Sequence, residues 1–140
     1  MKRRVVDASV GAKWILPEVY TENALRLLSE DIEFLVPDLF YIEIANILWQ
    51  RVRRREISKD DADDHYRDIA NTDLKTYPSE SLANAALDMA CETGQTAYDC
   101  LYVALALREG VPLITADRPL YDGLLPYPAY AAHTVWIADV

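Results

Sequence analysis

Short apolar runs, separated by longer segments with helical spacing, most constrain the fold of this chain. Four such runs cover residues 4–6, 34–36, 111–115 and 134–137, and a weaker run covers residues 74–77. Parallel strands are joined by helical crossovers and consist of continuous apolar residues, because both of their faces are buried. The alternation therefore predicts the α/β class, as a three-layer α/β/α sandwich with a central parallel sheet.

The segments between these runs carry the periodicity and the end signals of helices. The expected helices cover residues 22–30, 39–54, 58–71, 79–94 and 96–107. Asp38 is expected to cap the second of them, and Ser58 with Asp61 forms a capping-box signature before the third. Pro17 restricts residues 14–20 to short helical pieces, and residues 117–122 are expected to form a turn.

Composition excludes several classes of protein. The 140 residues are 51% apolar, which suits a single domain spanning residues 1–140. With 14 basic and 23 acidic residues the formal net charge is −9, so bulk electrostatics does not hold this chain on nucleic acid. The longest apolar run, residues 100–107, is too short to span a bilayer, and two cysteines are too few for a disulfide framework. We therefore expect a cytoplasmic protein with no membrane partner.

Four acidic residues fall where strands end or helices begin. Asp7 follows the first strand, and Asp117 comes two residues after the strand that ends at Thr115. Glu43 lies in the second turn of its helix, and Asp99 lies in the first turn of its own. Right-handed crossovers begin each helix at the carboxyl edge of a parallel sheet, which is also where ligands bind. The order of elements therefore predicts that the four carboxylates converge at this edge.

Convergence of these carboxylates would be costly without compensation. Two like charges about 5 Å apart repel by roughly 3 kcal/mol at an effective dielectric near 20. Proton uptake or a bound cation relieves that repulsion. Carboxylate oxygens suit Mg²⁺ or Mn²⁺, so we expect Asp7, Asp99 and Asp117 to hold the metal for attack of water on a phosphodiester. Glu43 is expected to position the water, or to hold it through a second metal.

Each of the acids also has a structural explanation. Asp99 fits a capping box with Thr96, and Asp117 is placed to cap the following turn through Leu120. Asp7 is an ordinary turn residue after a strand. Glu43 is the hardest to explain in this way, because mid-helix acids normally face solvent and its neighbours are apolar.

Basic residues that could contact phosphate are few. The densest group is Arg51, Arg53, Arg54 and Arg55, and Lys13 is a further candidate. The arginines equally suit the negative end of the helix dipole, so both interpretations stay open.

Four sequence motifs resemble those of PIN-domain ribonucleases of the VapC toxin type. They are residues 5–10 (VVDASV), 41–48 (YIEIANIL), 96–106 (TAYDCLYVALA) and 113–120 (LITADRPL). The resemblance implies a PIN-like α/β/α fold, Mg²⁺- or Mn²⁺-dependent cleavage of RNA, and often a homodimer. It also implies a small antitoxin protein that occupies the active-site groove, frequently through a basic side chain. By motif position, Asp7, Glu43, Asp99 and Asp117 match the acidic tetrad, with Ser9 and Thr115 as supporting hydroxyls.

Two other functions compete with a toxin-type endoribonuclease. One is a metal-dependent phosphatase of another α/β fold, although such enzymes with an aspartyl nucleophile usually show Asp-x-Asp and Ser9 stands two places after Asp7. The other is a non-catalytic PIN-like scaffold that binds RNA or protein. The sequence does not identify the RNA target.

Overall fold

The computed structural model describes residues 1–140 and contains one five-stranded parallel sheet. The strands are β1 (Lys2–Val6), β2 (Ile32–Pro37), β3 (Leu74–Tyr77), β4 (Leu113–Thr115) and β5 (Thr134–Trp136), in the spatial order β3-β2-β1-β4-β5. All four strand pairs are parallel. The chain turns back after β2 and β3 to place β4 on the other side of β1. Ligands bind in parallel sheets at such a switch point.

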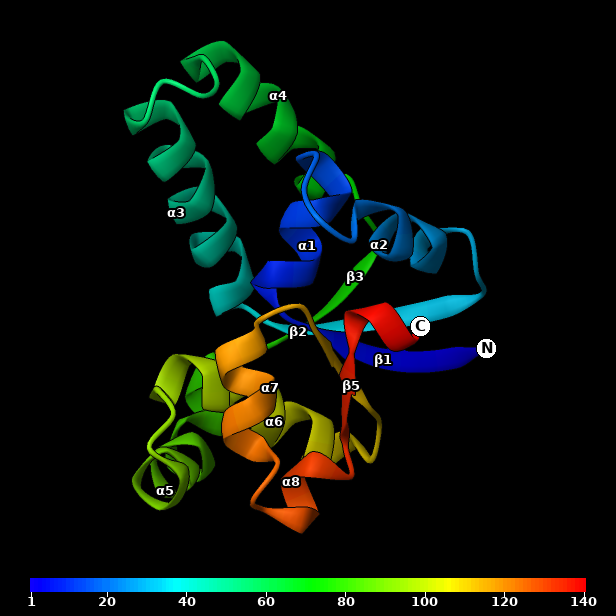
Figure 1. Cartoon of the computed structure of the whole chain (residues 1–140), viewed down its shortest axis with the longest axis vertical. Coiled ribbons are helices and arrows are strands. Elements are labelled where there is room, and N and C mark those ends of the chain that lie inside the picture. The colour runs from blue at the N-terminus through cyan, green and yellow to red at the C-terminus, as the bar shows by residue number, and fades with distance from the viewer.

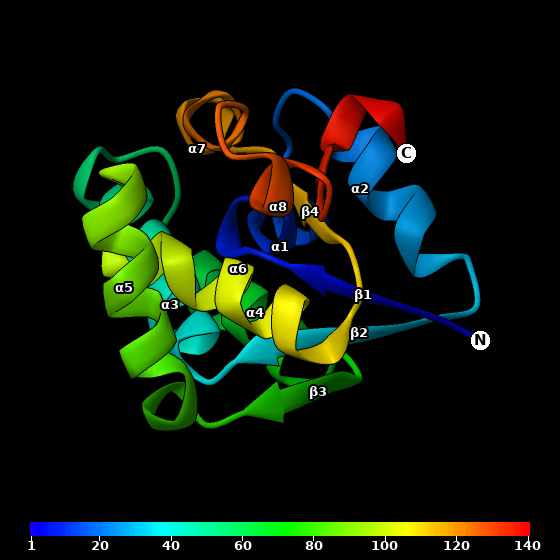
Figure 2. The ribbon, with the colours of Figure 1, turned by 90° about the horizontal axis from the view of Figure 1, so that it is seen from below.

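Helices cover both faces of the sheet, which confirms the predicted three-layer arrangement (Figures 1 and 2). The helices are α1 (Ala8–Ile15), α2 (Thr21–Leu28), α3 (Leu39–Arg53), α4 (Lys59–Ala70), α5 (Ala83–Thr93), α6 (Ala97–Glu109), α7 (Arg118–Leu124) and α8 (Pro128–Ala131). Short 3-10 turns, η1 (Ser79–Leu82) and η2 (Ile137–Asp139), precede α5 and follow β5. Helices α1 to α4 lie on one side of the sheet, and α5 and α6 lie on the other (Figure 1).

The core packs against both faces of the sheet, and α6 is the helix with the longest buried run. Seven consecutive residues of α6, from Cys100 to Ala106, are buried, because this helix contacts β1 and β2 on one side and α5 on the other. A helix enclosed in this way is apolar all round, which explains why its sequence lacks an amphipathic pattern. None of the helices combines the length and apolar character needed to cross a membrane.

The structure corrects three local predictions. Helix α1 begins directly after Asp7, where no helix was expected, because the Asp7 carboxylate accepts a hydrogen bond from the Val10 N–H. The expected turn at residues 117–122 is the helix α7, and α8 was not anticipated. Helix α2 and the capping box between Ser58 and Asp61 are confirmed, with small differences in where the elements end.

The prediction that Asp38 caps α3 is wrong, because a residue that is distant in the sequence takes this role. The Leu39 N–H donates instead to the Ser79 hydroxyl, and the Asp38 carboxylate accepts from the Ser79 N–H. Strands β2 and β3 are neighbours, so the chain after β3 reaches the start of α3. A residue forty positions away therefore caps this helix.

Helices α1 and α3 approach closely at Gly11. A Cβ atom at this position would lie 2.6 Å from Cζ of Phe40 and 3.4 Å from Cδ1 of Ile44. Both of these α3 side chains are completely buried. They flank Glu43 in the sequence, so the missing side chain at Gly11 lets α1 sit against the part of α3 that carries this acid.

We predict that Gly11→Ala lowers the free energy of unfolding by up to about 2 kcal/mol. Overpacking a core costs about 1–3 kcal/mol, which exceeds the helix-propensity gain of about 1 kcal/mol over glycine. Urea denaturation measures the change. Gly123→Ala is the matched control, because its new Cβ meets only the flexible end of Gln95. Equal stability of Gly11→Ala and the parent protein would show that Phe40 can move aside.

A candidate active site of four carboxylates

The four predicted acids line one pocket at the carboxyl edge of the sheet. This acidic pocket has a volume of about 180 Å³ and is lined by Asp7, Ala8, Ser9, Glu43, Ile47, Asp99, Tyr102 and Asp117. Asp7 follows β1, Asp117 follows β4, and the other two acids stand near the beginnings of α3 and α6. The predicted convergence is therefore present in the structure, while the catalytic and metal-binding roles of these side chains stay predictions.

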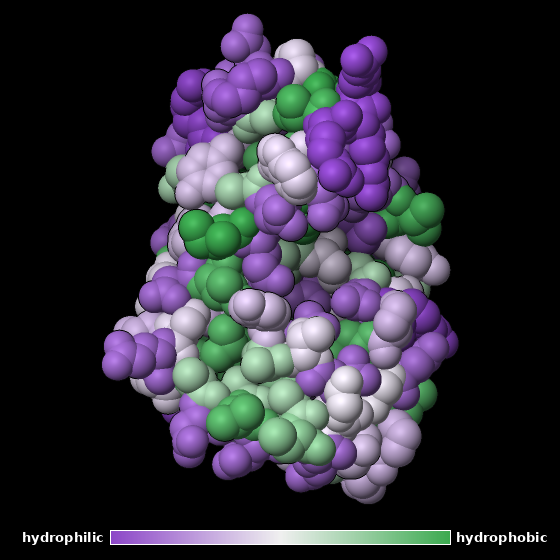
Figure 3. Space-filling view, turned by 90° about the vertical axis from the view of Figure 1, so that its left-hand side faces the viewer, coloured by the Kyte–Doolittle hydropathy of each residue, from purple (hydrophilic) through white to green (hydrophobic).

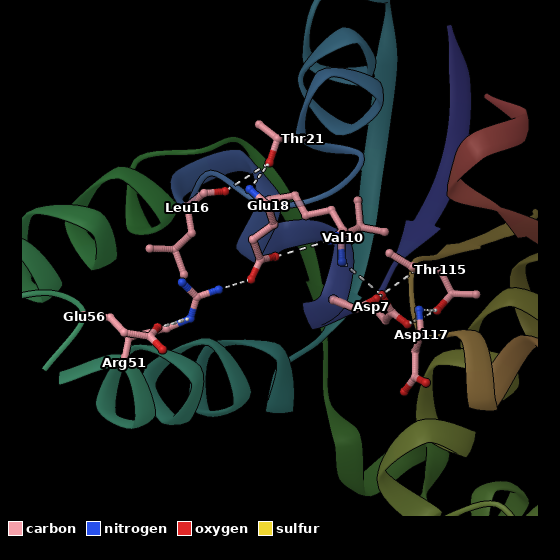
Figure 4. A network of polar contacts seen from close by, with 12 residues as sticks. Asp7, Val10, Leu16, Glu18, Thr21, Arg51, Glu56, Thr115 and Asp117 are labelled. Atoms are coloured by element: carbon pink, nitrogen blue, oxygen red, sulfur yellow. Dashed lines mark hydrogen bonds and ion pairs between the residues drawn. The ribbon is translucent and has the colours of Figure 1, made fainter. Parts of the chain in front are cut away.

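The Asp7 carboxylate is the most enclosed of the four and is only 5% exposed. Its Oδ1 accepts from the Ser9 hydroxyl at 2.5 Å, and its Oδ2 accepts from the Thr115 hydroxyl at 2.5 Å. The same two hydroxyls accept the N–H groups of Ala116 and Asp117 at 2.9 and 3.0 Å (Figure 4). One carboxylate thus connects β1, α1 and β4 to the segment that carries the fourth acid.

Glu43 is held by a residue that the sequence analysis missed. The hydroxyl of Tyr102 donates to Oε1 of Glu43 at 2.5 Å, and the Tyr102 side chain is 1% exposed. Burial, reinforced by the Glu43 charge, raises the pKa of Tyr102, so its hydroxyl keeps the proton that it donates. The sequence spacing could have indicated Tyr102 as a residue of the site. It follows Asp99 by three residues, and residues three apart on a helix share a face.

The structural explanations for Asp99 and Asp117 hold only in part. Thr96 accepts the Asp99 N–H at 3.1 Å, but the reciprocal bond from the Asp99 carboxylate that would complete a capping box is absent. Asp117 does cap α7, since its Oδ1 accepts from the Leu120 N–H at 3.2 Å. The Asp99 carboxylate therefore accepts no backbone N–H, and the second oxygen of Asp117 accepts no hydrogen bond.

Crowding and burial disfavour the charged forms of three of these acids. Burial raises the pKa of Asp7 to about 7, although the Ser9 and Thr115 hydroxyls act in the opposite direction. Burial also raises the pKa of Glu43, to which the Asp99 charge contributes. The pKa of Asp99 is raised by burial and by the charge of Asp117. Both proton uptake and a bound cation would relieve this strain.

The donor set fits a hard divalent cation in its chemistry. The pocket offers carboxylate and hydroxyl oxygens and contains no thiolate or imidazole, which matches the ligands of Mg²⁺ or Mn²⁺. As the side chains stand, no three acidic, histidine or cysteine side chains are arranged around a common point. A bound cation would draw the carboxylates toward it and offset the repulsion between them.

The predicted phosphate-binding residues do not line the pocket. Lys13 Nζ lies 3.3 Å from Oε1 of Glu18, and Arg51 forms ion pairs with Glu18 and Glu56 (Figure 4). Contrary to expectation, Lys13 and Arg51 are thus neutralised within the chain. Glu18, which follows Pro17 in the loop between α1 and α2, was not recognised as their partner.

The remaining predicted phosphate contacts are exposed and lie far along α3. Arg53 is ten residues beyond Glu43, about 15 Å along the helix axis, and its guanidinium lies 5.0 Å from the ring centroid of Trp49. Arg54 and Arg55 follow it at the end of the helix and are exposed. Their contact with substrate stays a prediction.

We predict that the metal-free protein loses stability as the pH rises from 5 to 8. A carboxyl whose pKa is higher in the folded than in the unfolded state stabilises the fold at low pH, and this contribution is lost as the pH rises through the folded-state value, about 7 for Asp7. Thermal melts in EDTA should show a fall of several degrees, and Asp7→Asn should flatten the profile. Asp64→Asn, at an exposed position of α4, should leave it unchanged. A profile that rises between pH 5 and 7 would contradict the burial of a titrating Asp7.

Comparison with known proteins agrees with this fold. The sequence matches the PIN domain family over residues 4–122. It is 36% identical over 120 residues to ribonuclease VapC3 of Pyrobaculum aerophilum, covering 84% of this chain and 92% of that protein. The crystal structure of PAE2754 from the same organism has a TM-score of 0.72 at 22% identity, over 99% of this chain and 85% of the other.

A toxin-antitoxin complex from Klebsiella pneumoniae contains a chain with the same fold. Its TM-score is 0.64 at 11% identity, over 94% of this chain and 95% of the other. The family match and the similarity to ribonuclease VapC3 show that this chain belongs to the PIN-domain family and is a VapC-type member of it.

Proposed function

We propose that this protein is a Mg²⁺- or Mn²⁺-dependent endoribonuclease that acts as the toxin of a toxin-antitoxin pair. The observation that carries the proposal is the acidic pocket, in which Asp7, Glu43, Asp99 and Asp117 meet at the carboxyl edge of the sheet. Ribonuclease VapC3, at 36% identity, supports RNA as the substrate. Membership of the PIN family removes the support for a phosphatase of another α/β fold.

Asp7, Asp99 and Asp117 would hold the cation in this proposal. When bound, a divalent ion neutralises charge on the phosphate and makes a water molecule easier to deprotonate. Ser9 and Thr115 fix the Asp7 carboxylate, since each of its two oxygens accepts a hydrogen bond from one of these hydroxyls. Each of these hydroxyls is itself fixed by a backbone N–H, so Asp7 has little freedom to turn away.

Glu43 is the proposed base of the reaction. Its Oε1 accepts a hydrogen bond from the Tyr102 hydroxyl. The other oxygen, Oε2, is free to take a proton from the attacking water. Burial raises the pKa of Glu43. A general base is more effective when its pKa lies closer to the pH at which the enzyme works. Tyr102 therefore orients the carboxylate without occupying the oxygen that reacts.

The proposed partner is a small antitoxin protein that inserts a basic side chain among the four carboxylates. The Klebsiella pneumoniae protein of the same fold is part of a toxin-antitoxin complex, which supports such a partner. The pocket also suits a guanidinium or an ammonium group, because no basic side chain of this chain lines it. A paired cation would relieve the crowding of the acids as a metal would.

A homodimer is the proposed assembly. Apolar side chains gather on the face of the molecule that carries α3 and α5 (Figure 3). On these two helices, Ile42 is 67% exposed and Leu87 is 55% exposed. Exposed apolar patches of this kind mark protein–protein contacts. Sedimentation of the purified chain tests this assembly directly.

We predict metal-dependent cleavage of RNA that Asp99→Asn abolishes. Loss of a group that supports a metal ligand already costs about 10- to 100-fold, so loss of a proposed ligand should lower the rate by about 100-fold or more. Cleavage of structured RNA is measured with Mg²⁺, with Mn²⁺ and with EDTA, and Asp64→Asn serves as the matched control. Equal cleavage in all of these conditions would refute the proposal.

The non-catalytic scaffold makes a different prediction in a thermal melt. A cation that binds only the folded state raises its stability by about 2.7 kcal/mol at 100 times the dissociation constant. The proposed nuclease should be stabilised by Mn²⁺ in this way, and Asp99→Asn should not. A scaffold without a metal site would show neither stabilisation nor cleavage.

We predict that Tyr102→Phe lowers kcat by roughly 10- to 100-fold with little change in KM. The variant keeps the ring in the core but removes the hydroxyl that orients Glu43, and correctly placed general bases contribute about 10²- to 10⁴-fold. Steady-state cleavage of an RNA substrate separates the two parameters. Tyr98→Phe on the same helix is the control, since Tyr98 is 63% exposed. A rise in KM alone would instead place Tyr102 in substrate binding.

A further inference from the structure

A cluster of one arginine and three aromatic rings lies outside the acidic pocket. The Arg118 guanidinium carbon lies 5.1 Å from the ring centroid of Trp136 and 5.5 Å from that of Tyr121. The Trp136 ring also meets Tyr121, with centroids 5.8 Å apart, and is packed edge-on by Tyr20, also at 5.8 Å. We refer to these four residues as the Arg–aromatic cluster.

This cluster adjoins the acidic pocket. Arg118 directly follows Asp117, and Trp136 is in register with Thr115, the last residue of β4. Residues in register on neighbouring strands carry their side chains on the same face of a sheet. The hydroxyl of Thr115 points to Asp7, so the Trp136 ring lies on the face of the sheet where Asp7 is held.

Arg118 is an exposed basic residue directly beside Asp117, one of the acids that line the pocket. Lys13 and Arg51 form ion pairs with Glu18 and Glu56, and no basic side chain lines the pocket itself. Arg118 pairs with Asp122 at 3.1 Å, but their side chains are 58% and 51% exposed. Such exposed pairs contribute little and are screened by salt, so the guanidinium can exchange this carboxylate for a phosphate.

The aromatic part of the cluster remains accessible. Tyr20 is 38% exposed, and the rings of Tyr121 and Trp136 are partly exposed. Tyr20 has a left-handed backbone with φ of 68°, which is uncommon for a residue with a side chain. This conformation belongs to the residue whose ring packs against Trp136.

We propose that the Arg–aromatic cluster is a nucleotide subsite that takes an unpaired base of the RNA next to the cleaved bond. The base would stack on the guanidinium and rings, and the adjacent phosphate would pair with Arg118. Unpaired bases stack on aromatic rings and on arginine planes, whereas bases inside a duplex are not available for this contact. The inference rests on the proposed function and assigns to these four residues the binding of the nucleotide beside the cleaved bond.

Binding of RNA to the full-length Asp99→Asn protein in EDTA tests the subsite without cleavage. The probe is a fluorescent single-stranded RNA of about 12 nucleotides, within the site sizes known for such binding, and fluorescence anisotropy gives Kd. Arg118→Ala and Trp136→Leu should each weaken binding about tenfold. Arg118→Lys should restore only part of the loss, because lysine keeps the charge but has no plane for stacking. A fully base-paired RNA of the same length should bind weakly to all of the proteins.

The matched control is Arg67→Ala. Arg67 forms a comparable exposed ion pair with Asp64 on α4, so this variant makes the same charge change away from the pocket and should leave Kd within about twofold. Circular dichroism confirms folding of Trp136→Leu, and the exposed Arg118 variants provide the test independently of it.

Three outcomes would overturn the subsite. They are unchanged binding by Arg118→Ala, full restoration by Arg118→Lys, and equal affinity for duplex RNA. The proposed function fails by a different measurement, namely the absence of metal-dependent cleavage by the unmodified protein. Cleavage that persists while the Arg118 variants bind RNA normally would refute the subsite alone.

Discussion

The buried carboxylate of Asp7 is the interaction on which the arrangement of this molecule depends. It ends the central strand β1, caps α1 through the Val10 N–H, and accepts the hydroxyl protons of Ser9 and Thr115. An unpartnered carboxylate at 5% exposure would be very costly, so these donors and the elements that carry them must assemble together. Because Ser9 and Thr115 in turn hold the segment of residues 116–117, the same bonds fix the edge of the sheet where the other acids arrive.

The chain keeps its own cations out of the pocket that this arrangement creates. Glu18 pairs with both Lys13 and Arg51, and Arg51 also pairs with Glu56, so these two partly buried basic side chains are held away from the pocket. Asp7, Glu43 and Asp99 are therefore left without a cation from within the chain. Burial, with a smaller contribution from the charge of a neighbouring acid, raises the pKa of each of the three. A protein with a net charge of −9 can act on a polyanion under such conditions only if the compensating charge is local.

Much of the fold and the whole acidic tetrad could be predicted from sequence, because both depend on order along the chain. Apolar runs and helical spacing place each element, and right-handed crossovers then bring Asp7, Glu43, Asp99 and Asp117 to one edge. The failures involve partners that are distant in sequence. Ser79, and not Asp38, caps α3. Arg51 forms an ion pair with Glu18. The Tyr102 hydroxyl, on another helix, donates a hydrogen bond to Glu43. Helix α1 was missed because its cap belongs to the preceding strand rather than to a recognisable helix start.

The precision of the site comes from the apolar core more than from contacts between the acids, which repel one another. Asp99 begins α6, and seven consecutive residues of that helix are buried between the sheet and α5, so the helix cannot rotate without exposing core surface. Glu43 stands on α3 beside Phe40 and Ile44, which pack against α1 at Gly11. Hydrophobic burial thus holds charged groups at separations that their electrostatics oppose. The same rigidity keeps the pocket from collapsing and sets the spacing of the oxygen ligands offered to a cation or to a basic group.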